Sequence, residues 1–183
     1  MNIIVFFSGS GTNLEAIIKS QDRFKYNVLA AFTNNPGAKG VSICEKYHIQ
    51  CHILDHNQFS CRKDFDTEIG KFLADFEVDY LILAGYMRIL SEAFVDDWQG
   101  QIINIHPSLL PKYPGLNTHQ RVLEAKEEAH GTTIHFVTNE LDSGPIIRQE
   151  SIKIEPSDTQ ESLMERIKEL ENKIYPETIS QLP

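Results

Sequence analysis

Cysteine is scarce in this sequence of 183 residues, and long apolar runs are missing. The three cysteines, Cys44, Cys51 and Cys61, form no C-x-x-C pair, which argues against a disulfide framework and favours free thiols in a reducing compartment. The apolar start at residues 1–7 lacks the basic region and cleavage site of a signal peptide, and no run approaches the ~20 residues of a membrane span. We therefore expect a cytoplasmic protein without a membrane partner.

Basic residues are also few. The chain has 17 Lys and Arg against 26 Asp and Glu, so its formal net charge is −9. Nucleic acids and anionic membranes bind clustered Lys and Arg, so this balance argues against both as partners, although a few local donors can hold the phosphate of a small substrate. Internal repeats are absent, and a hydrophobic content of 41% is sufficient for the core of one domain.

Strand-like and helix-like segments alternate from the first residue. The continuous apolar run at residues 3–7 is typical of a strand buried on both faces. Phe65, Ile69, Phe72 and Phe76 keep the spacing of an amphipathic helix. Further strands are expected at residues 27–33, 51–54, 80–84 and 101–105. This alternation predicts an α/β fold with a single domain, built on a mostly parallel, Rossmann-like sheet with helices on both faces.

The pattern changes after residue 130. Two strands are expected at residues 132–138 and 146–154 with no helix between them, so they predict an antiparallel C-terminal strand pair in a mixed sheet. We expect Ser157 or Asp158 to cap a final helix, and Pro176 to kink or end it.

A glycine-rich turn, SGSGTN at residues 8–13, joins the first strand to the first helix. Glycine lets a ligand approach the unpaired N–H groups of a helix start, and the helix dipole favours an anion there. The turn is not a dinucleotide fingerprint, because Leu14 occupies the third glycine position, and it lacks the Gly-Lys-Ser/Thr of a P-loop. A phosphate cradle and a plain turn with a Thr or Asn cap both remain open.

Asn104 and His106 stand at the end of a buried strand and project to the same face. Open α/β sheets bind ligands at the carboxyl ends of their strands. An amide donor beside an imidazole suits acyl transfer, since the amide can stabilise an oxyanion and the imidazole can relay a proton. Alone, however, an Asn-x-His pair is more often structural.

Asp142 lies in a turn ending in Ser-Gly-Pro, between the two last strands and after His135. A carboxylate there can pair with an imidazole and favour its charged form, but the same residues are also common turn formers. His48, His52 and His56 cross from a helix into a strand, so they cannot share one helical face, and we expect no metal site.

Taken together, these segments resemble the folate-dependent phosphoribosylglycinamide formyltransferases, also called glycinamide ribonucleotide transformylases. The resemblance covers essentially the whole chain. It is strongest at residues 8–13, 83–90, 104–115, 130–137 and 141–145.

The resemblance implies the formyltransferase fold and a role for each matching residue. It implies that Gly11, Thr12 and Asn13 hold the substrate phosphate and that Glu171 contacts the ribonucleotide. It implies that Arg62, Met87, Arg88, Ile89 and Leu90 bind the folate, the last four largely through their backbone. It implies a catalytic set of Asn104, His106 and Asp142. It also implies one formyltransferase domain over residues 1–183, with a phosphate-binding half (1–100) and a catalytic and folate-binding half (101–183).

The implied reaction moves the formyl group of 10-formyltetrahydrofolate, a co-substrate, to the amine of glycinamide ribonucleotide in de novo purine (IMP) biosynthesis, without a metal. The amine attacks directly; Asn104 and protonated His106 stabilise the oxyanion, and a proton passes through His106 or a water held by Asp142. The His106–Asp142 pair should lie within about 2.6–3.2 Å or share one water. We expect small-molecule partners, no nucleic acid, and a monomer or homodimer.

Three alternatives share parts of this pattern. A formyltetrahydrofolate deformylase, which is a hydrolase, has the same core but usually an added N-terminal domain. A methionyl-tRNA formyltransferase needs a basic C-terminal domain, for which this chain has neither length nor charge. A non-catalytic binding module would lack the catalytic set. The family usually continues into a short strand and tail beyond the point where this sequence stops, which leaves the order at the sheet edge open.

Overall fold

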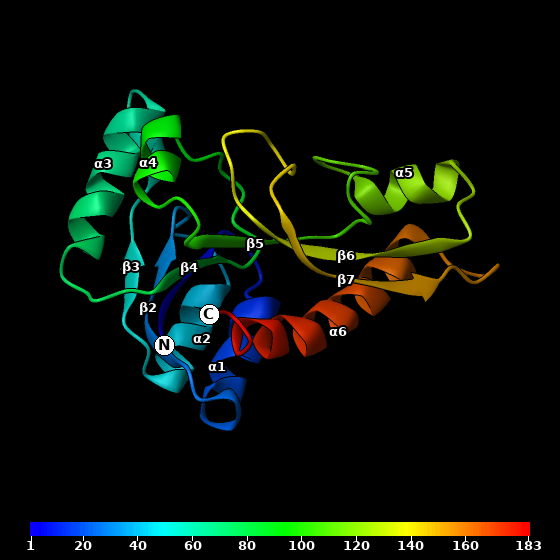
Figure 1. Ribbon diagram of the computed structural model, residues 1–183, viewed down its shortest axis with the longest axis horizontal. Coiled ribbons are helices and arrows are strands. Elements are labelled where there is room, and N and C mark those ends of the chain that lie inside the picture. Colours follow the sequence, from blue (N-terminus) through cyan, green and yellow to red (C-terminus); the bar gives the residue numbers. More distant parts are fainter.

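The buried apolar segments form one seven-stranded sheet with the order β3-β2-β1-β4-β5-β6-β7 (Figure 1). The computed structural model describes residues 1–183. The strands are β1 (Asn2–Phe7), β2 (Asn27–Thr33), β3 (Cys51–Ile53), β4 (Tyr80–Leu83), β5 (Ile102–His106), β6 (Ala129–Phe136) and β7 (Ile146–Lys153). The first five strands are parallel, whereas β6 is antiparallel to both β5 and β7.

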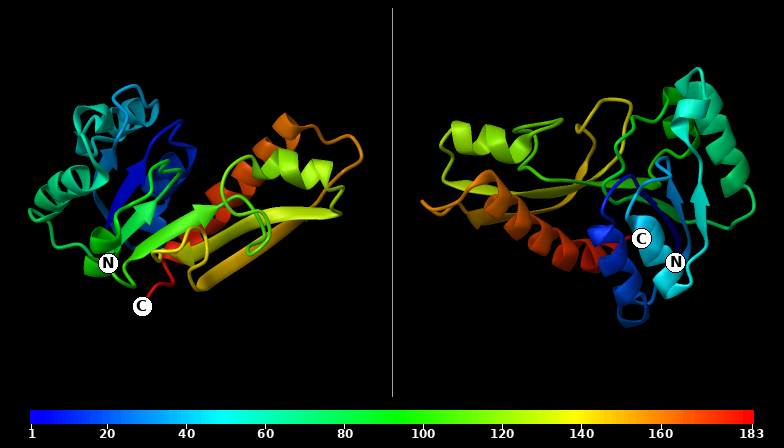
Figure 2. Two further views of the ribbon diagram at one scale, coloured as in Figure 1. Left: turned by 90° about the horizontal axis from the view of Figure 1, so that it is seen from above. Right: turned by 180° about the vertical axis from the view of Figure 1, so that it is seen from behind.

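Helices cover both faces of this sheet because alternate residues of each strand point to opposite sides. Ile3 and Val5 of β1 belong to one hydrophobic cluster, while Ile4 and Phe6 belong to another. The helices are α1 (Thr12–Phe24), α2 (Gly40–Tyr47), α3 (Arg62–Leu73), α4 (Glu92–Asp97), α5 (Thr118–Glu124) and α6 (Gln160–Ile179), with a short 3₁₀ turn η1 (His56–Gln58). Helices α1, α2 and α6 pack in the first cluster, and α3 and α4 in the second (Figures 1 and 2).

The expected architecture is confirmed as a single α/β domain with a mostly parallel sheet and an antiparallel C-terminal strand pair. β7 forms the sheet edge that the sequence left open. A buried tyrosine ties the last helix to the sheet: the Tyr175 hydroxyl lies 3.0 Å from the Leu83 carbonyl and 3.1 Å from the Ile103 carbonyl. No helix is both long and apolar enough to cross a membrane.

Two details of the expected helices are wrong, and one of the two outcomes expected at Pro176 does not occur. Helix α3 ends at Leu73, so Phe76 lies beyond it, although its ring still packs on the second cluster. The N-cap of α6 is Thr159, not Ser157 or Asp158, because Thr159 forms a reciprocal capping box with Ser162.

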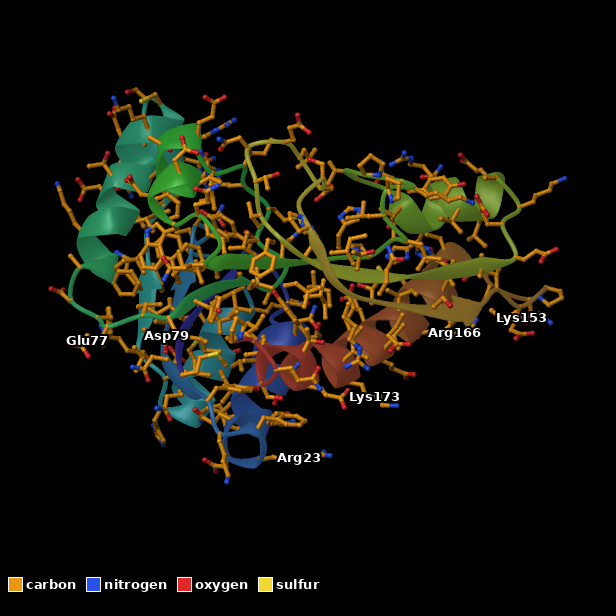
Figure 3. All side chains as sticks on the ribbon, in the orientation of Figure 1. Arg23, Glu77, Asp79, Lys153, Arg166 and Lys173 are labelled. Carbon is orange, nitrogen blue, oxygen red and sulfur yellow. The ribbon has the colours of Figure 1, made fainter.

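Asp158 instead pairs with Arg166, whose guanidinium also donates to the Lys153 carbonyl at 2.9 Å, and Figure 3 labels Arg166 and Lys153 at this end of the molecule. Pro176 does not end α6, which continues to Ile179. The proline removes one N–H donor, but burial of Tyr175 and Ile179 on either side of it holds the last turn against the core.

Candidate active site

The chain reverses its direction of strand addition between β1 and β4, and this switch point opens a crevice at the carboxyl ends of the strands. A hollow of about 300 Å³ lies there. Residues from the glycine turn, from the segment after β4, from the end of β5 and from α5 and α6 line it: Ser8, Gly11, Asn13, Gly85, Met87, Ile105, Pro107, His119, Lys168 and Glu171. The candidate phosphate and catalytic regions therefore adjoin.

The glycine turn presents a helix start with no side-chain cap. Gly11 is the N-cap of α1 with φ 75°, and the helical ladder begins only with the bond from the Glu15 N–H to the Gly11 carbonyl. The N–H groups of the first turn therefore have no helical partner, as an anion site requires. A Cβ on Gly11 would lie 2.7 Å from Gly40 Cα, so the turn needs glycine both for its backbone angle and for its contact with α2.

Asn13 and Glu171 join the two ends of the chain at this turn. The Asn13 amide donates to Glu171 Oε2 at 3.0 Å, and Glu171 Oε1 lies 3.1 Å from the Thr132 hydroxyl. That hydroxyl has one hydrogen and also lies 2.9 Å from the His106 carbonyl, so a protonated Glu171 can donate to Thr132 while Thr132 donates to His106. Burial favours this arrangement, because it raises the pKa of Glu171.

The orientation of the Asn104 amide is set by His135, which faces it across the β5–β6 ladder. His135 Nδ1 lies 2.8 Å from the Phe136 carbonyl, so it carries the proton, and Nε2 is left as an acceptor. The Asn104 Nδ2 group therefore donates to Nε2 at 3.2 Å and keeps a second N–H free. Burial lowers the pKa of His135 and so favours its neutral form.

His106 lies between two acceptors. Its Nε2 donates to the Tyr113 carbonyl at 3.0 Å, and its Nδ1 lies 3.4 Å from Asp142 Oδ2. Asp142, with φ 51° and a side chain only 7% exposed, accepts from the Gly115 N–H at 2.8 Å. A carbonyl on one side and a carboxylate on the other suit an imidazolium with two N–H donors.

The expected His106–Asp142 contact is thus close but slightly longer than a direct hydrogen bond. The physical reason is sharing: the carboxylate that faces His106 is held by the Gly115 N–H, and its other oxygen lies 3.9 Å from His135 Nε2. Asp142 points into the site between the two imidazoles rather than into solvent.

The segment after β4 alternates between outward and inward side chains. Met87 is 69% exposed and Ile89 is 55% exposed, whereas Leu90 is buried. Arg88 is half-buried and places its guanidinium over the Phe65 ring at 4.9 Å. Its side chain therefore anchors the segment to α3, and only the backbone and the exposed side chains are free to contact a ligand.

Arg62 is not brought into contact with the other candidate residues. It is the exposed first residue of α3 and lies one helical turn before Phe65. Its side chain is exposed at the start of the helix whose Phe65 ring carries the Arg88 guanidinium.

The structure adds residues that the sequence-based reasoning gave no role. His135 was noted near Asp142, but its contact with Asn104 depends on strand register. Lys168 lies one turn before Glu171 on α6, and this spacing of three was an available signal for a cation at the hollow. His119 Nδ1 lies 3.0 Å from His130 Nε2, and burial lowers the pKa of both histidines.

No group of three or more His, Cys, Asp or Glu side chains is arranged to hold a metal ion. The three histidines spaced by four lie on separate elements: His48 ends α2, His52 stacks on Phe72 at 4.5 Å, and His56 belongs to η1.

Comparison with known proteins gives a consistent set of relatives. The sequence pattern of the formyl transferase family matches residues 1–179. The chain is 43% identical over 182 residues to phosphoribosylglycinamide formyltransferase of Escherichia coli K12, covering 98% of this chain and 86% of that protein. It is 44% identical to part of the trifunctional purine biosynthetic protein adenosine-3 of Gallus gallus, covering 96% of this chain but 18% of that protein.

Solved structures agree with these sequence matches. The phosphoribosylglycinamide formyltransferase of Coxiella burnetii superposes with a TM-score of 0.94 at 44% identity, over 98% of this chain and 85% of that one. Glycinamide ribonucleotide transformylase 1 of Symbiobacterium toebii gives a TM-score of 0.95 at 36% identity, over 98% of this chain and 86% of that one.

Proposed function

The chain belongs to the formyl transferase family, and we propose that it moves the formyl group of 10-formyltetrahydrofolate onto the amine of glycinamide ribonucleotide in purine biosynthesis. The observation that carries this proposal is the convergence of Asn104, His106 and Asp142 beside a hollow that ends at an uncapped helix start. One end of that arrangement suits a phosphate, and the other suits acyl transfer.

The ribonucleotide occupies the hollow in this proposal. Its phosphate accepts from the free N–H groups of Gly11, Thr12 and Asn13 at the start of α1, where the helix dipole also favours an anion. Lys168, which also lines the hollow, supplies a positive charge. Glu171 contacts the ribose, since it already lies against Asn13 at the floor of the hollow.

The folate lies against the segment Met87–Leu90, whose backbone groups bind the pterin ring. Exposed Met87 and Ile89 offer apolar contact, and Arg88 keeps the segment attached to α3 through Phe65. In this proposal the exposed guanidinium of Arg62 pairs with a carboxylate of the folate.

The reaction is a direct attack of the substrate amine on the formyl carbon. Negative charge gathers on the formyl oxygen, where the second N–H of Asn104 donates to it and the positive charge of the His106 imidazolium stabilises it. For His106 to donate or relay a proton, its Nε2–H exchanges the Tyr113 carbonyl for the reacting atoms. The C–N bond to the folate then breaks as a proton moves from the attacking amine to the departing folate nitrogen, through His106 or a water held by Asp142. Holding the two substrates side by side provides much of the rate gain, and no metal takes part.

The division of the chain follows from the same proposal. Residues 1–100 supply the phosphate turn and also the proposed folate contacts at Arg62 and Met87–Leu90, so the folate-binding residues fall in this half rather than in the second. Residues 101–183 supply Asn104, His106 and Asp142. The halves meet at the Asn13–Glu171 bond, so neither forms the site alone. We propose that the enzyme is cytoplasmic, in keeping with its free cysteines. We also propose that it works as a monomer or homodimer.

The test is to mix the protein with 10-formyltetrahydrofolate and glycinamide ribonucleotide and to detect the formylated product by mass spectrometry. Product should form only when both substrates are present. Equal release of formate without the ribonucleotide would instead indicate a deformylase, which can use the same catalytic residues but has no need of the phosphate turn.

A further inference from the structure

Ser8 joins the glycine turn to the folate segment through one nearly buried hydroxyl. The side chain follows β1 directly, and the residue is 9% exposed. Its Oγ accepts from the Met87 N–H at 2.8 Å and donates to Asn34 Oδ1 at 2.5 Å. The hydroxyl therefore has a donor and an acceptor as fixed partners, which sets its direction.

The backbone of Ser8 is held as firmly as its side chain. Its N–H donates to the Gly85 carbonyl at 3.1 Å, and its carbonyl accepts from the Asn35 amide at 3.1 Å. Gly9, the next residue, accepts from the Gly40 N–H at 3.1 Å. The start of the phosphate turn is thus fixed to the turn after β2, to α2 and to the segment after β4.

Met87 depends on this contact because its own side chain packs little. That side chain is 69% exposed, so the position of its backbone rests on hydrogen bonds. The far end of the segment is fixed by Asp66, a buried carboxylate that accepts from the Ser91 N–H at 2.6 Å. Ser8 provides the matching attachment at the near end, beside the hollow.

We propose that Ser8 is a positioning residue for formyl transfer: its hydroxyl fixes the Met87 backbone, and with it the formyl donor, relative to the turn that holds the ribonucleotide phosphate. This inference rests on the proposed function. Ser8 touches neither reacting atom; it acts through the distance between two bound substrates. A direct transfer needs them at near-attack separation, and a misplacement of ~1 Å can cost ~100-fold in rate.

A purely structural role would also make Ser8 sensitive to substitution. Its loss leaves the Met87 N–H and Asn34 Oδ1 without partners at a nearly buried position, so some loss of stability is expected either way. The discriminating measurements are therefore the separate kinetic constants for the two substrates and the local protection of the Met87 amide.

The experiment compares Ser8→Ala with wild type and with Ser42→Ala, a matched control whose hydroxyl donates to the Lys39 carbonyl at 2.8 Å on the exposed side of α2. We expect kcat of Ser8→Ala to fall ~10- to ~100-fold, with the KM for the ribonucleotide nearly unchanged. Hydrogen exchange at Met87 should accelerate selectively. Ser42→Ala should match wild type in all three measurements.

Ser8→Cys serves as a second variant, measured in the presence of a reductant, because it keeps the shape with a weaker acceptor and should lose less kcat than Ser8→Ala. If Ser8→Ala does not fold, a wild-type kcat in Ser8→Cys despite accelerated exchange at Met87 overturns the proposal. Retention of kcat and of Met87 protection in a folded Ser8→Ala, with only a lower Tm, overturns it as well. A wild-type protein that makes no formylated product instead defeats the proposed function, and Met87 exchange still reports whether Ser8 holds the segment.

Discussion

Replacement of Asp142 by Asn is the sharpest test of the proposed catalytic set, because it removes the negative charge and keeps the shape of the side chain. The position has φ 51°, which Asn tolerates as well as Asp. The amide oxygen of Asn can still accept from the Gly115 N–H, which now donates to Oδ2 at 2.8 Å. We therefore expect Asp142→Asn to fold normally and to retain both substrate surfaces.

The size of the effect follows from the distance to His106. For unit charges 3.4 Å apart, Coulomb's law gives ~5 kcal/mol at an effective dielectric constant of ~20. The amide dipole of Asn keeps part of this attraction, so we expect Asp142→Asn to lose ~1.5–3 kcal/mol, the range for a hydrogen bond to a charged group. This loss corresponds to a fall in kcat of ~10-fold at the lower end and of the order of 100-fold near 3 kcal/mol.

The assay is steady-state formyl transfer with each substrate varied in turn. An interaction that matters in the transition state lowers kcat while KM for both substrates stays within a few-fold of wild type. His106→Ala should behave alike, and the double variant should be little worse than the worse single variant, because the two residues act as a unit. Asp75→Asn, an exposed substitution outside the site, is the control. Near-normal kcat in a folded Asp142→Asn would refute the proposed mechanism and leave the fold untouched.

Three further predictions concern other parts of the molecule. Gly11→Val should raise the KM for the ribonucleotide before that for the folate, with some loss of Tm from its clash with Gly40; a larger effect on the folate would show that the substrates are misplaced. Burial lowers the pKa of His130 to about 4, so between pH ~6.5 and 4 the unfolded chain binds more protons than the folded protein, and the stability present above pH ~6.5 should be lost as the pH falls toward 4. Urea denaturation at pH 7.5 and at pH 5 measures this loss. If the unfolding free energy of His130→Gln falls between these two pH values by as much as that of wild type, the prediction is contradicted. Tyr175→Phe removes a buried hydroxyl from the carbonyls of β4 and β5 and should cost ~1–3 kcal/mol of unfolding free energy, whereas a cost near zero would mean that those carbonyls are satisfied otherwise.

Local patterns predicted the central strands of the sheet because these strands are buried on both faces. The run at residues 3–7 and the turn after residue 33 mark β1 and β2 closely, since no other element suits such apolar segments. Helix ends were less predictable. Thr159 and Asp158 are both good caps in sequence, and only the capping box with Ser162 and the pairing of Asp158 with Arg166 decide between them.

The short helices could not be predicted from the sequence for a different reason. Helix α4 has six residues and α5 has seven, so neither shows two full turns of periodicity. Their places depend on tertiary contacts, such as Phe94 in the second hydrophobic cluster. The same limit applies to the His119–His130 pair, because His119 is carried by α5 and meets a strand residue that the sequence cannot place beside it.

At the candidate site, the role of a sequence motif depends on the pairing register of the strand beside it. Asn104 and His106 are two apart, and that spacing alone puts them on one face of β5. It does not say which hydrogen of the Asn104 amide is free. That is decided across the sheet, where the antiparallel pairing of β6 sets His135 opposite Asn104 and Thr133 opposite His106. A slip of one residue would turn His135 to the other face and leave the Asn104 amide without a fixed direction. The switch from parallel to antiparallel pairing at β5 therefore matters for the proposed mechanism, because it brings a neutral acceptor to Asn104, and the turn that follows β6 carries Asp142 back to His106.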